Sequence, residues 1–122
     1  MRSGEVGLER GDDGLTVVLI QGEHDLSTAP VLRSQLEQLI SDGGPLVIDL
    51  TEATFIDSSI LGTVLQARRD ATEAEVGFAV AHGGGADAVE RVLEITGLRA
   101  DLPVHRSRED ARAQALGAGT VG

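Results

Sequence analysis

The sequence predicts an α/β fold: a single domain in which a mixed, mostly parallel β-sheet is flanked by about four α-helices. Short apolar runs rich in β-branched residues alternate with apolar stripes at helical spacing. Glycine, proline and aspartate mark the turns between them. The 122 residues suffice for one compact core. We assign residues 1–117 to this domain and expect a flexible C-terminal tail at residues 118–122.

The chain is expected to open with two strands. Residues 6–10 form a weak first strand, and the Asp-Gly pair at positions 13–14 predicts a hairpin turn, because these residues tolerate a positive φ. Residues 15–20 are nearly all apolar, which is typical of a strand covered on both faces. Residues 22–26 are expected to be a loop.

A helix follows this loop. Ser27 or Thr28 can cap it, and Pro30 is tolerated in its first turn. Gly43 is expected to end it. Its apolar stripe comprises Leu32, Leu36, Leu39 and Ile40.

The middle of the chain predicts a strand over residues 46–50, a short polar loop, and a helix over residues 58–71. A further strand is expected over residues 77–81. The inward stripe of the helix comprises Leu61, Val64 and Leu65.

The last third predicts one more helix, a short edge strand and a final helix. Three glycines from Gly83 lead into the first of these helices, which Gly97 ends. The strand at residues 102–105 should lie at an edge, because Pro103 cannot donate within a sheet. Ser107 and Asp110 resemble a capping box at the start of the final helix.

Composition argues against several function classes. Acidic residues outnumber basic ones by 20 to 10, and the net charge is −10. Such a chain is repelled by nucleic acid and by anionic membrane surfaces. There is no cysteine for disulfide or thiolate chemistry. No apolar run approaches the ~20 residues that span a bilayer. We expect a cytoplasmic protein with no nucleic-acid or membrane partner.

Three possible sites find little support in the sequence. The glycine-rich segment at residues 82–85 resembles an esterase oxyanion loop, but the nucleophile motif G-x-S-x-G is missing. Neither nucleotide-binding glycine motif occurs. His24 lies between two acidic residues, and we interpret it as a solvated loop histidine. No metal site and no cofactor are therefore expected.

Asp57, Ser58 and Ser59 form the most informative segment, because they lie where a helix begins. Either Asp57 or Ser58 can be the N-cap, and Ser59 is then spare. A hydroxyl in a first helical turn, near the carboxyl end of a strand, lies where open α/β sheets present functional groups. Free backbone N–H groups there favour an anion.

The surroundings of these serines resemble the STAS domain family, specifically the bacterial anti-sigma factor antagonists. The resemblance covers residues 14–116. It is carried by four segments in order, Gly-Glu-His-Asp-Leu from Gly22, Leu-Val-Ile-Asp-Leu-Thr from Leu46, Phe-Ile-Asp-Ser-Ser-Ile-Leu-Gly from Phe55, and Val-Leu-Glu-Ile-Thr-Gly-Leu from Val92.

This resemblance implies a regulatory binding protein and no enzyme. Antagonists of the family bind an anti-sigma factor, often also a serine kinase, and thereby free a sigma factor. Phosphorylation of a serine at this helix start breaks the complex, and a serine phosphatase resets it. The acceptor implied here is Ser59. The implied partner-binding residues are Asp25, Asp57, Ser58, Ser59, Ile60 and Leu61.

Two residues depart from the family pattern, and two alternatives stay open. His24 replaces an apolar residue, and Ile60 stands where a small residue is common. We expect Ile60 to be exposed, to contact the partner and to crowd the kinase. One alternative is a STAS scaffold, or an accessory subunit for small-ligand or lipid transport, without phosphorylation. The other is a small hydrolase using Ser58 or Ser59, for which the sequence offers no nearby base.

Overall fold

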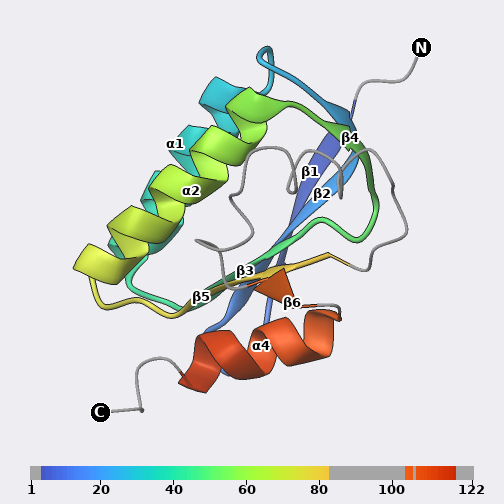
Figure 1. The fold of residues 1–122 in the computed structure, drawn as a ribbon. Helices are drawn as coiled ribbons and strands as arrows, with labels where there is room; N and C mark the ends of the chain where they lie inside the picture. The colour runs from blue at the N-terminus through green and yellow to red at the C-terminus, as the bar shows by residue number, and fades with distance from the viewer. Residues whose placement is uncertain (1–3, 83–103, 106, 118–122) are drawn as a thin grey trace.

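In the computed structural model, a mixed β-sheet has helices on both faces (Figure 1). The structure describes residues 4–82, 104–105 and 107–117. The elements are β1 (Glu5–Arg10), β2 (Thr16–His24), α1 (Ala29–Asp42), β3 (Leu46–Asp49), β4 (Ala53–Ile56), α2 (Ser58–Glu73), β5 (Phe78–Ala81), β6 (Val104–His105) and α4 (Arg108–Gly117). The expected helix after Gly85 and the expected tail lie outside the described residues.

The strand order is β1-β2-β3-β5-β6, with β4 also paired to β2. Only β1 runs antiparallel to its neighbour among the described strands. Gly14 has a φ of +82° in the turn between β1 and β2, which confirms the predicted hairpin. The remaining described strands pair in parallel, and α1 and α2 lie in the connections from β2 to β3 and from β3 to β5, as the alternating pattern predicts.

The loop before α1 and the loop before α2 are both shorter than the sequence indicated. β2 continues through His24, so most of the predicted loop at residues 22–26 is strand. The predicted loop before α2 contains β4, which pairs with the second half of β2. Gly22 makes this change of partner possible, because it has a φ of +80° and donates its N–H to Glu52 O at 3.1 Å.

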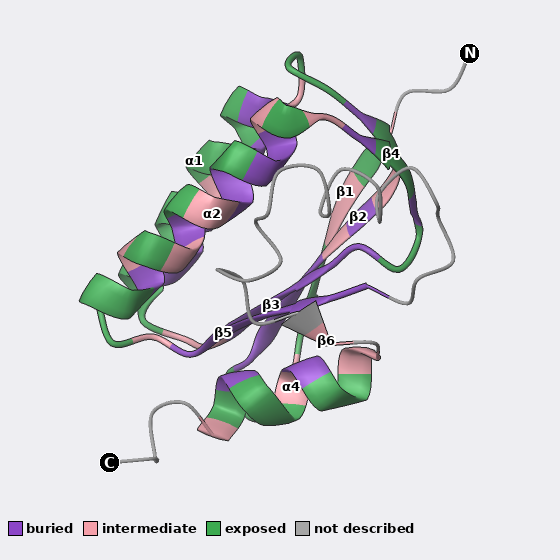
Figure 2. Cartoon of the chain, viewed as in Figure 1, coloured by how far each residue is buried: buried purple, intermediate pink, exposed green. Residues whose placement is uncertain are grey.

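The main core lies between the sheet and the helices α1 and α2. In Figure 2 the buried sides of both helices face the sheet, and their exposed sides face outward. Alternate residues of each strand point to this side, as the period of two requires. Each buried leucine or isoleucine contributes about 1.5–3 kcal/mol. The largest fully buried side chains here include Ile20, Leu32, Leu36, Leu46, Ile48, Leu50, Ile56, Ile60 and Leu61.

The opposite face of the sheet carries a thinner layer, covered by α4. Both buried residues of this helix are alanines, and β5 presents Ala79 and Ala81 to the same cluster. The helix comes so close that a Cβ on Gly77 would lie 1.8 Å from Ala115 O. Because the side chains on both sides are small, the backbone of α4 lies close to the backbone of the sheet.

The helix ends follow the predicted signals in most places. Gly43 caps α1 with a φ of +85°, and Asp110 N donates to Ser107 Oγ at 3.1 Å at the start of α4. Thr28 occupies the N-cap of α1 without a side-chain cap hydrogen bond. The expected capping of α1 by a hydroxyl is therefore not observed.

An ion pair between a buried aspartate and a partly exposed arginine ties α4 to the sheet. Asp49, at the end of β3, is 1 % exposed and lies 2.7 Å from Arg108 Nε. The other Asp49 oxygen accepts from Thr51 N and Thr51 Oγ1, at 2.8 Å and 2.6 Å. Arg108 also lies 3.3 Å from Glu9 of β1. Three elements thus meet at one guanidinium.

We predict that Arg108→Met destabilises the fold by about 1–3 kcal/mol, because it leaves the buried Asp49 carboxylate without its counter-charge. Arg112→Met is the matched control, since its pair with Asp13 is partly exposed on both sides. Its loss should cost less than about 1 kcal/mol. Urea denaturation of the two variants measures the difference. Equal losses would contradict the assignment of Arg108 as the main tie of α4.

Candidate functional site

The candidate site begins at the N-terminus of α2, where Asp57 is the cap. Its backbone is extended, with a φ of −103°. Asp57 Oδ1 accepts from Ser59 N at 3.0 Å and from Ile60 N at 3.2 Å. Of the two capping residues that the sequence allowed, Asp57 holds the position. Two N–H groups at the positive end of the helix are thereby satisfied by a carboxylate.

The two serines have different surroundings. Ser58 is exposed. Ser59 is half-buried, and its hydroxyl donates to Asp57 Oδ1 at 2.5 Å. Its carbonyl accepts from Thr63 Oγ1 at 2.9 Å. Asp57 therefore orients the Ser59 hydroxyl as well as capping the helix.

Ser59 lies on the side of α2 that borders α1. Ser59, Thr63, Gln66 and Asp70 recur at spacings of three and four residues, so they share one face of the helix. Arg33 and Glu37 occupy the corresponding side of α1, four residues apart. Both helices begin at the carboxyl edge of the parallel strands, and they run side by side on one face of the sheet (Figure 1).

An open hollow lies between the two helix starts. Its volume is about 330 Å³, and its lining residues are Leu26, Ala29, Pro30, Arg33, Ser59 and Thr63. We call it the Ser59 hollow. Leu26 at its rim is 70 % exposed. The hollow thus offers a hydroxyl, a guanidinium and an apolar rim to a binding partner.

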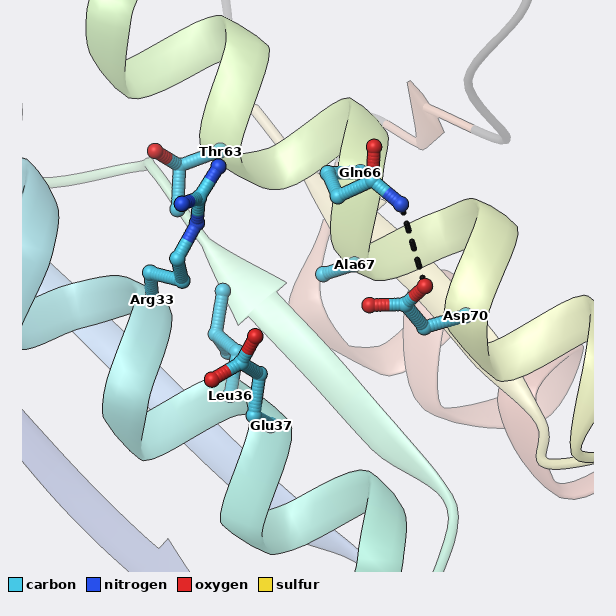
Figure 3. Close-up of a pocket in the computed structure, with 7 residues that line it drawn as sticks. All are labelled: Arg33, Leu36, Glu37, Thr63, Gln66, Ala67 and Asp70. Carbon is cyan, nitrogen blue, oxygen red and sulfur yellow. Dashed lines mark hydrogen bonds between the residues drawn. The ribbon is translucent and has the colours of Figure 1, made fainter.

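A narrow cleft continues from this hollow between α1 and α2. Figure 3 shows its lining, with Arg33, Leu36 and Glu37 from α1 and Thr63, Gln66, Ala67 and Asp70 from α2. The guanidinium of Arg33 reaches across toward Thr63 (Figure 3). Gln66 Nε2 donates to Asp70 at 3.0 Å further along. The cleft has a volume of about 10 Å³, which is room for about one water molecule, so it is nearly closed.

The expectation that Ile60 is exposed is wrong. Ile60 and Leu61 are both 0 % exposed and belong to the main core. Ile60 shares its helical face with Val64, Ala67 and Ala71, which are also buried. Neither side chain reaches the surface that Ser59 lines. Their role in this structure is to anchor the first turn of α2 to the sheet.

Asp25 lies in the turn that leads into α1. Its carboxylate accepts from Ser27 Oγ at 2.6 Å and from Ser27 N at 2.9 Å. The hydroxyl of Ser27, then its backbone N–H, and then the nearby His24 hold the pKa of this exposed carboxyl below its usual value. Asp25 precedes the turn residue Leu26, which forms the rim of the Ser59 hollow.

His24 is no solvated loop residue, contrary to the sequence interpretation. It is 2 % exposed and ends β2. Nε2 lies 2.9 Å from Gln21 O and 3.3 Å from Glu5 O, both acceptors, so this nitrogen carries the hydrogen. Nδ1 lies 3.2 Å from Thr28 Oγ1. His24 thus joins β1 and β2 to the turn before α1.

Hydrolase and metal chemistry gain no support from the described residues. His24 bonds to Thr28 and to backbone carbonyls, and its described hydrogen bonds do not include Ser58 or Ser59. In the same part of the chain, no three histidine or acidic side chains are grouped to hold a metal ion. Among the described helices, none has the length and apolar character needed to cross a membrane.

Of the residues that line the Ser59 hollow, only Ser59 was anticipated as a site residue, and the residues missed include Leu26, Arg33 and Thr63. Thr63 follows Ser59 by four residues, which is a readable signal for one helix face. Leu26 and Arg33 are about thirty residues earlier in the sequence. Only the parallel placement of α1 beside α2 brings them to Ser59, and no local pattern marks them.

The sequence matches a known domain family over most of its length. The STAS domain family model matches residues 9–111, and the chain belongs to this family. This agrees with the resemblance drawn from the serine segment and its neighbours.

Two relatives of this chain are named as anti-sigma factor antagonists. The anti-sigma-B factor antagonist of Listeria monocytogenes is 34 % identical over 91 residues, which are 74 % of this chain and 77 % of that protein. The crystal structure of an anti-sigma factor antagonist from Mycobacterium paratuberculosis has a TM-score of 0.81 at 29 % identity, covering 93 % and 95 % of the two chains.

A more distant structural neighbour shares the fold. SpoIIAA, a Bacillus cell fate determinant solved in its phosphorylated form, has a TM-score of 0.66 at 19 % identity, covering 89 % of this chain and 97 % of that one.

We predict that Asp57→Ala destabilises the protein by about 0.5–2 kcal/mol, because two N–H groups and the Ser59 hydroxyl lose their acceptor. Ser58→Ala is the control. It changes an exposed residue of the same turn and should alter stability by less than about 0.5 kcal/mol. Guanidinium unfolding followed by circular dichroism measures both. If Asp57→Ala leaves the stability unchanged, the cap does not hold the first turn.

Proposed function

We propose that this chain is an anti-sigma factor antagonist whose binding to an anti-sigma factor is switched off by phosphorylation of Ser59. The observation that carries the proposal is the position of Ser59. Its hydroxyl borders an open hollow and is oriented by Asp57, whereas the adjacent Ser58 is not among the residues lining that hollow. Membership of the STAS family and the names of the relatives support it.

The phosphorylation step requires an accessible and oriented hydroxyl. Ser59 Oγ attacks the γ-phosphorus of ATP, the bond to the β-phosphate oxygen breaks, and ADP leaves. The Ser59 proton passes to a base. Because Ser59 donates to Asp57, its oxygen lone pairs are free for the attack. The kinase is proposed to be the anti-sigma factor itself, and a serine phosphatase would reverse the step.

The effect of the phosphate on binding is electrostatic. A phosphoserine adds nearly two negative charges. Buried against a partner that supplies no counter-charge of its own, such a group costs up to about 3–5 kcal/mol. At about 1.4 kcal/mol per tenfold, affinity falls by roughly two to three orders of magnitude. The fold beneath is unaffected, because the buried neighbour Ile60 faces away from the modified hydroxyl.

The proposed partner surface comprises Asp25, Leu26, Asp57, Ser58 and Ser59. Ile60 and Leu61, which the sequence placed in this set, are left out because they are buried. Leu26 takes over the apolar contact that we expected of Ile60. It is the most exposed of the large apolar side chains in the described part of the chain, and it lines the hollow that Ser59 borders.

We predict that incubation with the partner kinase and Mg-ATP labels Ser59. Mass spectrometry of peptides locates the phosphate. Ser59→Ala should bind the anti-sigma factor and resist labelling, whereas the control Ser58→Ala should still be labelled. Labelling confined to Ser58 would overturn the assignment of the acceptor, and absence of any complex would overturn the proposed function.

We predict that Leu26→Ala weakens binding to the anti-sigma factor about 5- to 30-fold, because burial of the removed carbons is worth about 1–2 kcal/mol. Val31→Ala is the control, since Val31 is also exposed on α1 but does not line the hollow. Titration calorimetry with the unmodified protein compares them. If both variants bind like the parent, the partner does not use this rim.

A further inference from the structure

The Ser59 hollow contains a cation that the proposed switch does not yet use. Arg33 is exposed on α1 and lines both the hollow and the narrow cleft, together with Thr63 of α2. The described residues give Arg33 no hydrogen bond and no ion pair, whereas Arg108 and Arg112 are both paired. Its guanidinium is therefore available to an anion in the hollow.

The residues around Ser59 create a need for such a cation after modification. In the unmodified protein the Ser59 hydroxyl donates to Asp57. A phosphate ester on this oxygen has no proton to donate, so that hydrogen bond is lost. The new charge then lies next to the Asp57 carboxylate, which repels it. The helix N-terminus compensates only in part, because Asp57 already occupies two of its N–H groups.

We propose that the Arg33 guanidinium binds the phosphate of phosphorylated Ser59 by hydrogen bonds and an ion pair. This contact would connect α1 and α2 across the hollow. This inference rests on the proposed modification of Ser59. A planar guanidinium suits phosphate, because it can donate two parallel hydrogen bonds. The hollow of about 330 Å³ has room for the group without displacement of the core.

The other charged groups near the hollow oppose this pairing. Asp57 flanks Ser59, Asp25 lies in the turn before α1, and Glu37 stands one turn beyond Arg33, where it competes for the guanidinium. Of the residues that line the hollow, Arg33 is the basic one. A dianion between these carboxylates therefore shares its hollow with one basic residue, Arg33.

The pairing has a consequence beyond charge neutralisation. While the phosphate holds Arg33, this guanidinium is withdrawn from any partner that contacts the hollow. Modification then changes two residues of the surface at once, one on each helix. The phosphorylated protein would present a closed bridge where the unmodified protein presents an open groove.

The test uses the full chain with phosphoserine inserted at position 59 during translation, so it needs no kinase. Titration by ³¹P NMR gives the second ionisation of the phosphate. Arg33→Gln should lower this acid dissociation constant at least about threefold, because loss of a nearby cation disfavours the dianion. Arg33→Lys should lower the constant less than Arg33→Gln does, because lysine keeps the positive charge but lacks the two parallel N–H donors of a guanidinium.

Arg69→Gln is the matched control. It removes the same charge from an exposed position ten residues along α2, about 15 Å from Ser59. It should leave the titration unchanged. As a second measurement, the Arg33 side-chain N–H signals should shift on phosphorylation.

Equal titrations of the parent and Arg33→Gln, or equal effects of Arg33→Gln and Arg69→Gln, would overturn the inference. A failure of the kinase to label Ser59 would instead count against the proposed function, and the two failures are separable because the phosphoserine is installed without the kinase.

Discussion

The parallel pairing of β2, first with β3 and then with β4, is the constraint on which the site depends. β2 is long enough to serve both partners, and the positive φ of Gly22 marks the change between them. Because β2 and β4 run in the same direction, their carboxyl ends meet at one edge of the sheet. The helices that follow them therefore begin side by side. The hollow is the space left between those two beginnings, and its chemistry is set by whichever residues open each helix.

Much of the fold could be predicted from the sequence, since the strands and helices carry clear periods of two and 3.6. β4 was missed because Ala53 to Ile56 is short and its partner, the end of β2, is remote in sequence. His24 looked solvated beside two acids, but successive residues of a strand point to opposite faces. Ile60 looked exposed because it adjoins a surface serine. Its helical spacing to Val64 and Ala67 decides the matter, and that spacing was available in the sequence.

In the site, an exposed surface that can be modified at Ser59 lies on a first helical turn that is anchored to the core. Ile60 and Leu61 fix the first turn of α2 to the core, and Asp57 fixes its backbone from above. A chemical change at Ser59 consequently meets a structure that does not yield, and its effect is directed outward to whatever contacts the hollow. The remaining site residues on α1 were beyond sequence reasoning, because Arg33 has no local feature that distinguishes it from other surface arginines. These residues belong to the site only because α1 lies beside α2.

The thin layer beneath α4 has a different consequence, for the way in which related sequences can diverge. The helix is tied to Asp49 at its first turn, and its last turn passes so near to Gly77 that no side chain fits between them. A larger residue at Ala111, Ala115 or Gly77 would have to lift the whole helix and break the tie at the other end. We therefore expect substitutions on this side of the molecule to be tolerated at the outward positions of α4, such as Glu109, Ala113 and Gln114. The inner positions require small residues, because the helix packs so close to the sheet.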